Sequence, residues 1–182
     1  LVLLVHGIDE VGPIWDDLAP ALAAAGHNVA RFDYPNDQAL ADSASMLLAE
    51  LRCLRARGVE RIVIVGHSMG GAVALASGNK VLMMEHAVYS VISPEGAASI
   101  LFRDAKRAKD TAEAMKITAQ DLLKFRIVDD VVREPMGGAH RDPRIAIQKV
   151  GDAIEKALDT LAGLSPDDLR AQRKDRFYAI GR

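Results

Sequence analysis

Residues 61–72 read Arg-Ile-Val-Ile-Val-Gly-His-Ser-Met-Gly-Gly-Ala, and this stretch decides the fold that the sequence predicts. After Arg61 it is apolar as far as Val65, as in a parallel strand that is buried on both faces. Gly66-His67-Ser68-Met69-Gly70 then matches the pattern G-x-S-x-G. We therefore predict a strand, a tight turn with Ser68 at its tip, and a helix that starts near Gly70.

The same alternation of strand and helix repeats toward the N-terminus. Strands are predicted at Leu1–Val5 and Val29–Phe32, and an amphipathic helix at Gln38–Arg57 that ends before Gly58. A helix is also predicted at Ile14–Ala25, although Pro20 can break or kink it. The order β-α-β-α-β-α predicts a parallel, doubly wound sheet.

Beyond Gly71 the pattern becomes mainly helical. Short strands are predicted at Val81–Met84, Tyr89–Ile92 and Ile127–Val132. Helices are predicted at Pro94–Phe102 with Ser93 as its cap, at Lys106–Met115, after Thr118, from Pro143 to about Leu161, and from Ser165 to about Tyr178. No linker separates the two halves, so the helix after Ser68 is expected to continue through Gly70-Gly71-Ala72.

The turn around Ser68 has the chemistry of a nucleophile elbow. Side chains at positions 66 and 70 would collide with neighbouring backbone, and the turn lifts the Ser68 hydroxyl above the sheet. The Met69 amide then becomes one oxyanion donor, and Ile8, in the loop after the first strand, becomes the second. With His6-Gly7, these motifs make residues 1–77 resemble the N-terminal part of an α/β-hydrolase, an esterase or lipase acting on a small-molecule ester.

That resemblance also implies an acid and a histidine later in the chain, in the order Ser, Asp, His. Asp129 or Asp130, followed by His140, fits this order. However, only about ten residues separate the acids from the histidine, where family members place a helix and a strand. The order of residues therefore offers a triad, and the spacing counts against it.

Three later segments carry a different resemblance. Tyr89-Ser-Val-Ile-Ser-Pro-Glu-Gly96, Ala112-Glu-Ala-Met-Lys-Ile-Thr118 and Glu134-Pro-Met-Gly-Gly-Ala-His-Arg-Asp-Pro143 make residues 80–182 resemble the C-terminal part of the acetyl-CoA carboxylase carboxyltransferase alpha subunit. The resemblance implies a crotonase-like fold and assembly with a beta subunit and a biotin carrier protein. Carboxybiotin and acetyl-CoA would be substrates, and no cofactor would be bound covalently.

The two resemblances meet at Gly70-Gly71-Ala72. In the carboxyltransferase, a Gly-rich turn at this position directs backbone amides, here those of Gly70 and Gly71, at an oxyanion. Both glycines are expected to be too crowded for a β-carbon. The segment before Gly70 departs from the carboxyltransferase pattern, which makes the chain look like a chimera of 1–77 and 78–182, each with an incomplete site.

Composition limits the other possibilities. The net charge of −2 gives no indication of nucleic-acid binding, and the apolar runs are too short to span a membrane. Cys53 is the only cysteine, so a reducing compartment, the cytoplasm, is expected. The chain begins with Leu1 inside a strand pattern and lacks the features of a signal peptide, so it looks truncated there.

The sequence thus predicts an α/β fold. It would have a short parallel sheet with flanking helices, a partial α/β-hydrolase joined to and continuing into a partial crotonase-like fold, and a helical C-terminus. Part of a carboxyltransferase is the leading functional hypothesis because it covers more residues and motifs. A serine hydrolase that uses Ser68, and a non-catalytic chimeric or recombination product, remain the alternatives. No metal site is expected.

Overall fold

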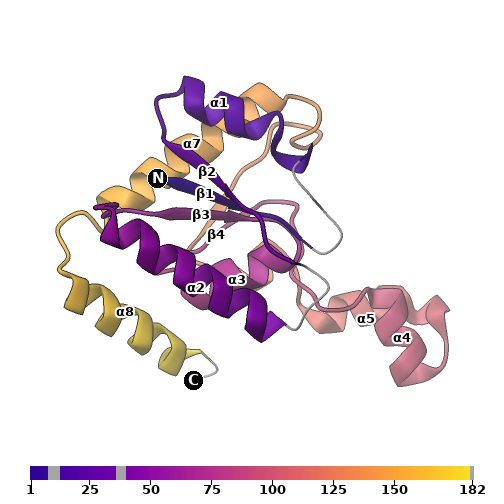
Figure 1. The fold of residues 1–182 in the computed structure, drawn as a ribbon. Coiled ribbons are helices and arrows are strands. Elements are labelled where there is room, and N and C mark those ends of the chain that lie inside the picture. Colours follow the sequence, from indigo (N-terminus) through magenta and orange to yellow (C-terminus); the bar gives the residue numbers. More distant parts are fainter. Residues whose placement is uncertain (8–12, 36–39, 181–182) are drawn as a thin grey trace. The chain divides into compact units, whose positions relative to one another are not determined.

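The computed structural model describes residues 1–7, 13–35 and 40–180, and the chain divides into two compact units, Leu1–Asn79 and Lys80–Arg182. Figure 1 shows the helices and strands of both units. The described residues form a mixed α/β structure with two small parallel sheets.

The first unit contains a three-stranded parallel sheet in the order β2-β1-β3. Its strands are β1 (Val2–Val5), β2 (Val29–Phe32) and β3 (Val63–Gly66). Its helical elements are η1 (Pro13–Trp15), α1 (Leu18–Ala24), α2 (Leu40–Ala56) and α3 (Met69–Ser77). This order confirms the predicted parallel sheet, with β1 at its centre between β2 and β3.

The residues of β1 alternate between two apolar clusters, one on each face of the sheet. Leu3 and Val5 pack in a cluster with Leu47 of α2, while Val2 and Leu4 pack in another with Leu22 of α1. All four residues of β1 are buried, which explains its continuous apolar sequence. In Figure 1, α1 and α2 accordingly lie on opposite sides of the three strands.

The turn between β3 and α3 brings backbones closer together than side chains would allow. Ser68 lies in the left-handed region, with φ of 54°. A β-carbon on Gly66 would lie 2.2 Å from the Gly70 carbonyl oxygen, and one on Gly70 would lie 2.3 Å from the Val5 carbonyl oxygen. The expected crowding is therefore confirmed for Gly66 and Gly70. It is wrong for Gly71, where a β-carbon would come no closer than 4.0 Å to a neighbouring atom, the Gly66 carbonyl oxygen.

The second unit contains a two-stranded parallel sheet and most of the helices. Its strands are β4 (Leu82–Met84) and β5 (Asp130–Val132), with Met83 opposite Val131. Its helical elements are α4 (Pro94–Phe102), η2 (Ala105–Arg107), α5 (Ala108–Met115), α6 (Ala119–Lys124), α7 (Pro143–Asp159) and α8 (Pro166–Ala179). The predicted caps are confirmed, because the Ser93, Thr118 and Ser165 side chains each accept a hydrogen bond from a first-turn amide.

Three predictions about the elements need correction. Tyr89–Ile92 is not a strand, because the Ser90 side chain bonds to the Ile92 backbone and leaves Val91 99% exposed. The helix predicted at Ile14–Ala25 is divided into η1 and α1, which places Pro20 in a first turn, where it is tolerated. The sheet of the first unit does not continue into the second, since β4 pairs with β5.

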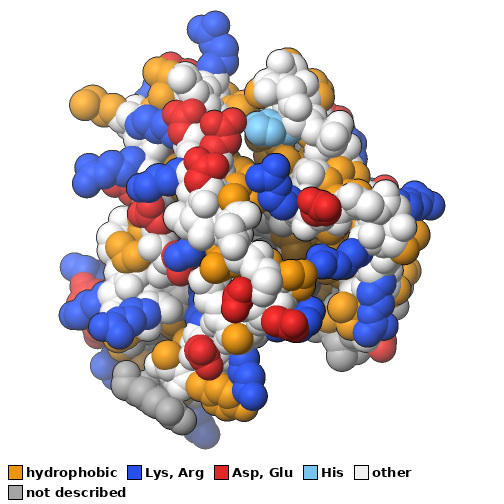
Figure 2. Space-filling model, turned by 90° about the vertical axis from the view of Figure 1, so that its left-hand side faces the viewer, with side chains coloured by type: hydrophobic (Ala, Val, Ile, Leu, Met, Phe, Trp, Pro, Cys, Tyr) orange, Lys and Arg blue, Asp and Glu red, His pale blue; other side chains and the backbone are white. Residues whose placement is uncertain are grey.

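Positive and negative side chains both occur on the face that Figure 2 shows. Lys and Arg side chains are mixed with Asp and Glu side chains there, and hydrophobic side chains lie between them. This mixture agrees with the small net charge of the chain. Among the described helices, none has the length and apolar character needed to cross a membrane.

The contrast between Gly70 and Gly71 gives a prediction. Gly70→Val should lower the free energy of unfolding by at least about 1 kcal/mol, because its side chain would overlap the backbone of β1. Gly71→Ala is the matched control and should be neutral or stabilising by up to about 1 kcal/mol, since it replaces glycine inside a helix without a clash. Urea melts of the three proteins measure both effects. Equal midpoints for Gly70→Val and wild type would contradict the close approach of α3 to β1.

Candidate functional site

The Ser68 turn lies at the carboxyl end of β3, the edge at which ligands bind in parallel α/β sheets. Ser68 and His67 are exposed, whereas Gly70 is buried against β1. The His67 amide donates to the Val5 carbonyl (3.1 Å), which fixes the turn to the end of β1. The structure therefore presents the Ser68 residue at the surface, as the G-x-S-x-G pattern predicts.

His6 and Tyr34, which follow β1 and β2, pack against each other near this edge of the sheet. His6 is buried, and its ring stacks on the Tyr34 ring at a centroid distance of 4.4 Å. The Tyr34 hydroxyl donates to the His6 carbonyl (2.7 Å), and the Tyr34 amide donates to His6 Nε2 (3.4 Å). Burial raises the pKa of the Tyr34 hydroxyl, so it stays protonated and able to donate. His6 is thus a structural residue of the first unit.

The backbone amides around Ser68 differ in what they can still bind. The Gly70 amide donates to the His67 carbonyl (2.9 Å), and the Gly71 amide donates to the Ser68 carbonyl (2.9 Å). The Met69 amide has no hydrogen bond to another described residue. The geometry therefore favours the Met69 amide over those of Gly70 and Gly71 as an oxyanion donor. Ile8, the other expected donor, lies outside the described residues.

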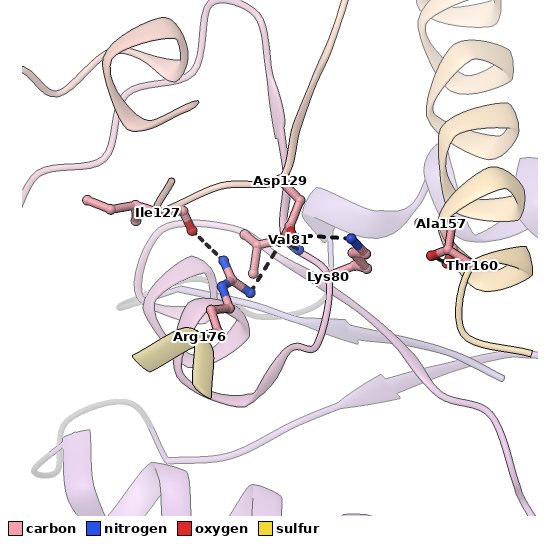
Figure 3. A network of polar contacts seen from close by, with 7 residues as sticks. All are labelled: Lys80, Val81, Ile127, Asp129, Ala157, Thr160 and Arg176. Carbon is pink, nitrogen blue, oxygen red and sulfur yellow. Dashed lines mark hydrogen bonds and ion pairs between the residues drawn. The ribbon is translucent and has the colours of Figure 1, made fainter. Parts of the chain in front are cut away.

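Asp129 holds the amino ends of β4 and β5 together (Figure 3). Its carboxylate accepts a hydrogen bond from the Val81 amide (2.8 Å), and its own amide donates to the Val81 carbonyl (2.8 Å). Lys80 and Arg176 pair with the same carboxylate at 3.5 and 3.4 Å. Arg176, which comes from α8, also donates to the Ile127 carbonyl. These contacts give Asp129 a structural role.

Asp130 and His140 do not complete a triad with Asp129. The Asp130 carboxylate accepts from the Val131 amide (2.8 Å) and lies 3.9 Å from Lys156. His140 is exposed, on the loop that follows the carboxyl end of β5. A strand rises about 3.3 Å per residue, so Asp130 and Asp129 lie roughly 7 and 10 Å along the strand from that end. Neither acid pairs with His140 among the described residues, so the structure does not bring the candidate triad together.

The carboxyl ends of β4 and β5 are joined by a second pair of acids, Glu85 and Glu134. The Glu85 carboxylate accepts from the Glu134 amide (3.0 Å), and the Glu134 carboxylate accepts from the His86 amide (3.0 Å). Glu134 also accepts from the Ala139 amide (2.8 Å), and its side chain is only 8% exposed. Each acid thus binds the backbone of the opposite strand, and Glu134 additionally binds the loop that carries His140.

Opposing effects act on the pKa of Glu134. Burial raises it, but the amides of His86 and Ala139 and the nearby His86 ring, 3.3 Å away, lower it more. The net pKa therefore lies below the ordinary value of 4.5. The ionised carboxylate is the form that holds the loop at neutral pH.

Sequence patterns alone do not single out Glu134 and Arg176 as residues that form this site. Glu134 stands out in the sequence only as part of the segment Glu134–Pro143. Its position two residues after buried Val132, at the end of a strand, is a usable signal, because an acid there can bind backbone amides of a neighbouring strand. Arg176 lies in a charged helix without a sequence signal that distinguishes it from Arg170 or Arg173.

The Glu134 contacts predict a stability change with a defined pH dependence. Because its folded pKa is lowered, the stability it contributes is present above the unfolded value of about 4.5 and is lost as pH falls through the folded pKa. Glu134→Gln should therefore lower the free energy of unfolding by about 1–3 kcal/mol at pH 7, with a smaller difference in acid. Urea melts at several pH values measure this.

Glu113→Gln, on an exposed position of α5, is the matched control and should have little effect. Amide hydrogen exchange provides a local measurement, since the Ala139 amide should exchange faster in Glu134→Gln than in wild type. Unchanged exchange and an unchanged midpoint would show that the carboxylate does not hold the loop.

Comparison with known proteins identifies what the chain is similar to. Residues 36–181 match the family model described as acetyl co-enzyme A carboxylase carboxyltransferase-like. Three similar relatives are acetyl-coenzyme A carboxylase carboxyl transferase alpha subunits. The Azorhizobium caulinodans protein is 63% identical over 121 residues, 66% of this chain and 38% of that protein. The Caulobacter vibrioides protein is 58% identical over 137 residues (70% and 43%), and the Xanthobacter autotrophicus protein is 57% identical over 145 residues (80% and 44%).

These matches extend further upstream than the resemblance over residues 80–182. The second unit has 103 residues (80–182), so at least 42 of the 145 residues matched in the Xanthobacter protein (145 − 103) precede Lys80. The similarity therefore crosses Gly70-Gly71-Ala72 and does not support a junction there. The chain spans about two fifths of the length of these relatives. This chain belongs to the acetyl co-enzyme A carboxylase carboxyltransferase-like family.

Proposed function

We propose that this chain is the C-terminal part of a carboxyltransferase alpha subunit. With the remainder of that subunit, a beta subunit and a biotin carrier protein, it would transfer a carboxyl group from carboxybiotin to acetyl-CoA in the cytoplasm and give malonyl-CoA. The observation that carries the proposal is the 57% identity over 145 residues with a curated alpha subunit. A crotonase-like arrangement of the complete subunit is part of the proposal.

The arrangement of the second unit supports this proposal. Its parallel strands β4 and β5 end at one edge, where Glu85 binds the amide of Glu134, the first residue of the motif segment Glu134–Pro143. Binding groups at such an edge are typical of α/β sheets. The loop after Glu134 is held in place because the Glu134 carboxylate binds its Ala139 amide. A fixed loop of this kind suits a reaction that depends on positioned backbone amides more than on titratable side chains.

A transplant tests the proposed function. Residues 80–182 would replace the corresponding part of the Azorhizobium caulinodans alpha subunit, co-purified with its beta subunit. We expect biotin-dependent malonyl-CoA decarboxylation, the reverse reaction, within about tenfold of the parent, because a tenfold loss corresponds to only about 1.4 kcal/mol of transition-state stabilisation. The isolated chain should show no detectable activity. A folded, assembled transplant below about 1% of parental activity would contradict the proposal.

The Ser68 turn supports a second candidate, a serine hydrolase with a partial α/β-hydrolase arrangement over residues 1–77. The positive φ of Ser68, the closely packed Gly66 and Gly70, and the unbonded Met69 amide are the observations in its favour. Since Asp129 and Asp130 do not pair with His140, the hydroxyl has no identified base. The remaining alternative, a non-catalytic chimeric product, predicts that neither activity is found.

Fluorophosphonate labelling tests whether Ser68 is the activated nucleophile that a serine hydrolase requires. Ser68 should be labelled slowly and Ser68→Ala not at all, because an exposed serine without a base keeps a nearly unperturbed hydroxyl. Ester turnover should not exceed about 10³–10⁴-fold over water, the level that oxyanion stabilisation and binding alone supply. Hydrolysis at ordinary enzyme rates, lost in both Ser68→Ala and His140→Ala, would instead establish the triad that the structure argues against.

A further inference from the structure

The loop Pro135–Arg141, called the Met136 loop below, has a tightly defined backbone. Its two successive turns are closed by hydrogen bonds from the Gly138 amide to the Pro135 carbonyl (2.9 Å) and from the Arg141 amide to the Gly138 carbonyl (3.1 Å). Gly137 and Gly138 have φ of 87° and 97°, values that glycine adopts without strain. The loop conformation is therefore specified by its own sequence.

The body of the second unit holds both ends of this loop. The Glu134 carboxylate binds the Ala139 amide on one side and the His86 amide on the other. At the far end, Asp142 caps α7 by accepting from the Ile145 amide (3.1 Å). A loop that is fixed in this way loses little conformational entropy when a partner binds it, so its contacts contribute to affinity nearly in full.

The side chain at the tip of this fixed loop is apolar and unprotected. Met136 is 100% exposed, although methionine is usually buried in folded proteins. Methionine packs adaptably against apolar and aromatic surfaces, and it is common at protein-binding surfaces for this reason. A fully exposed methionine on a fixed loop has the character of an anchor residue that enters a pocket on a partner.

The charged residues around the tip are unequally engaged. Arg133, Arg141 and Arg144 are exposed, and none of their side chains forms an ion pair or hydrogen bond within the described part of the chain. Arg141 also packs over Gly137, whose β-carbon would lie 3.0 Å from Arg141 Cγ. The nearby acids Glu134 and Asp142, in contrast, bind backbone amides. The guanidinium groups are therefore the charges available to a partner.

We propose that the Met136 loop is a protein-docking element whose partner has an apolar pocket rimmed by Asp and Glu side chains. Met136 fills the pocket, and the unpaired arginines face the rim. This inference rests on the proposed function, within which the partner is the carboxyltransferase beta subunit. The apolar tip favours a protein over a free phosphate-bearing ligand, which would require only the arginines.

Calorimetric titration of the full chain with the purified beta subunit of Azorhizobium caulinodans tests the inference. Met136→Ser should weaken binding about tenfold or more, as expected for an anchor residue. Arg141→Ala should weaken it several-fold and reduce its dependence on salt concentration, because the rim contact is electrostatic. Glu134→Gln, which keeps Met136 and the arginines but loosens the loop, should also weaken binding.

Matched controls separate docking from folding. Arg52→Ala removes an exposed arginine from α2, and Leu123→Ser shortens a partly exposed apolar side chain on α6; neither should change the affinity. Circular dichroism should show that Met136→Ser and Arg141→Ala are folded, since both side chains are exposed.

The outcomes distinguish failure of the docking role from failure of the proposed function. Wild-type binding that is unaffected by Met136→Ser would overturn the docking role while leaving the proposed function in place. An effect of Arg141→Ala without one of Met136→Ser, together with competition by inorganic phosphate, would identify an anion site and also overturn it. No binding of the wild-type chain would count against the proposed assembly and therefore against the inference that depends on it.

Discussion

The first unit depends on one steric constraint, the contact between the backbone of Gly70 and the carbonyl end of β1. With a β-carbon at Gly70 only 2.3 Å from the Val5 carbonyl oxygen, α3 could not start where it does. The same turn places Gly66 against Gly70, so two glycines together let β1, β3 and α3 converge. Ser68 adopts a positive φ as a consequence, since the chain must reverse within two residues. The exposed serine thus follows from how the backbone packs, before any chemistry is considered.

The second unit depends on a different constraint. Its sheet has only two strands among the described residues, and a two-stranded sheet alone is marginally stable in water. Acids stabilise β4 and β5 at both ends. Asp129 binds Val81 at the amino end, while Glu85 and Glu134 bind each other's strands at the carboxyl end. Each carboxylate accepts hydrogen bonds from backbone amides that lie beyond the short ladder. Removing one acid would therefore leave partly buried donors such as the Val81 and Ala139 amides unpaired, which costs more than the hydrogen bond itself contributes.

Sequence patterns predicted the elements well where local physics determines them. The apolar run of β1, the serine and threonine caps of α4, α6 and α8, and the glycines of the Ser68 turn all act through neighbouring residues, so they are visible in the sequence. The predictions failed where distant residues decide. Tyr89–Ile92 has the composition of a strand but no partner strand, and the roles of Asp129 and Glu134 depend on which strand lies beside β5.

There is a physical reason why Gly70-Gly71-Ala72 resembles a junction between two families. A glycine-rich turn between a buried strand and a helix satisfies the same steric requirement in any α/β fold, and it directs amides at the space above the sheet in each case. The G-x-S-x-G pattern therefore predicts the geometry of the turn, and it is a weaker indication of the reaction that takes place there. A complete triad would indicate a hydrolase reaction. However, the candidate acids Asp129 and Asp130 bind backbone amides at the amino end of β5, away from His140. Similarity that continues across the turn is the stronger guide, because it depends on many positions that this geometry does not require.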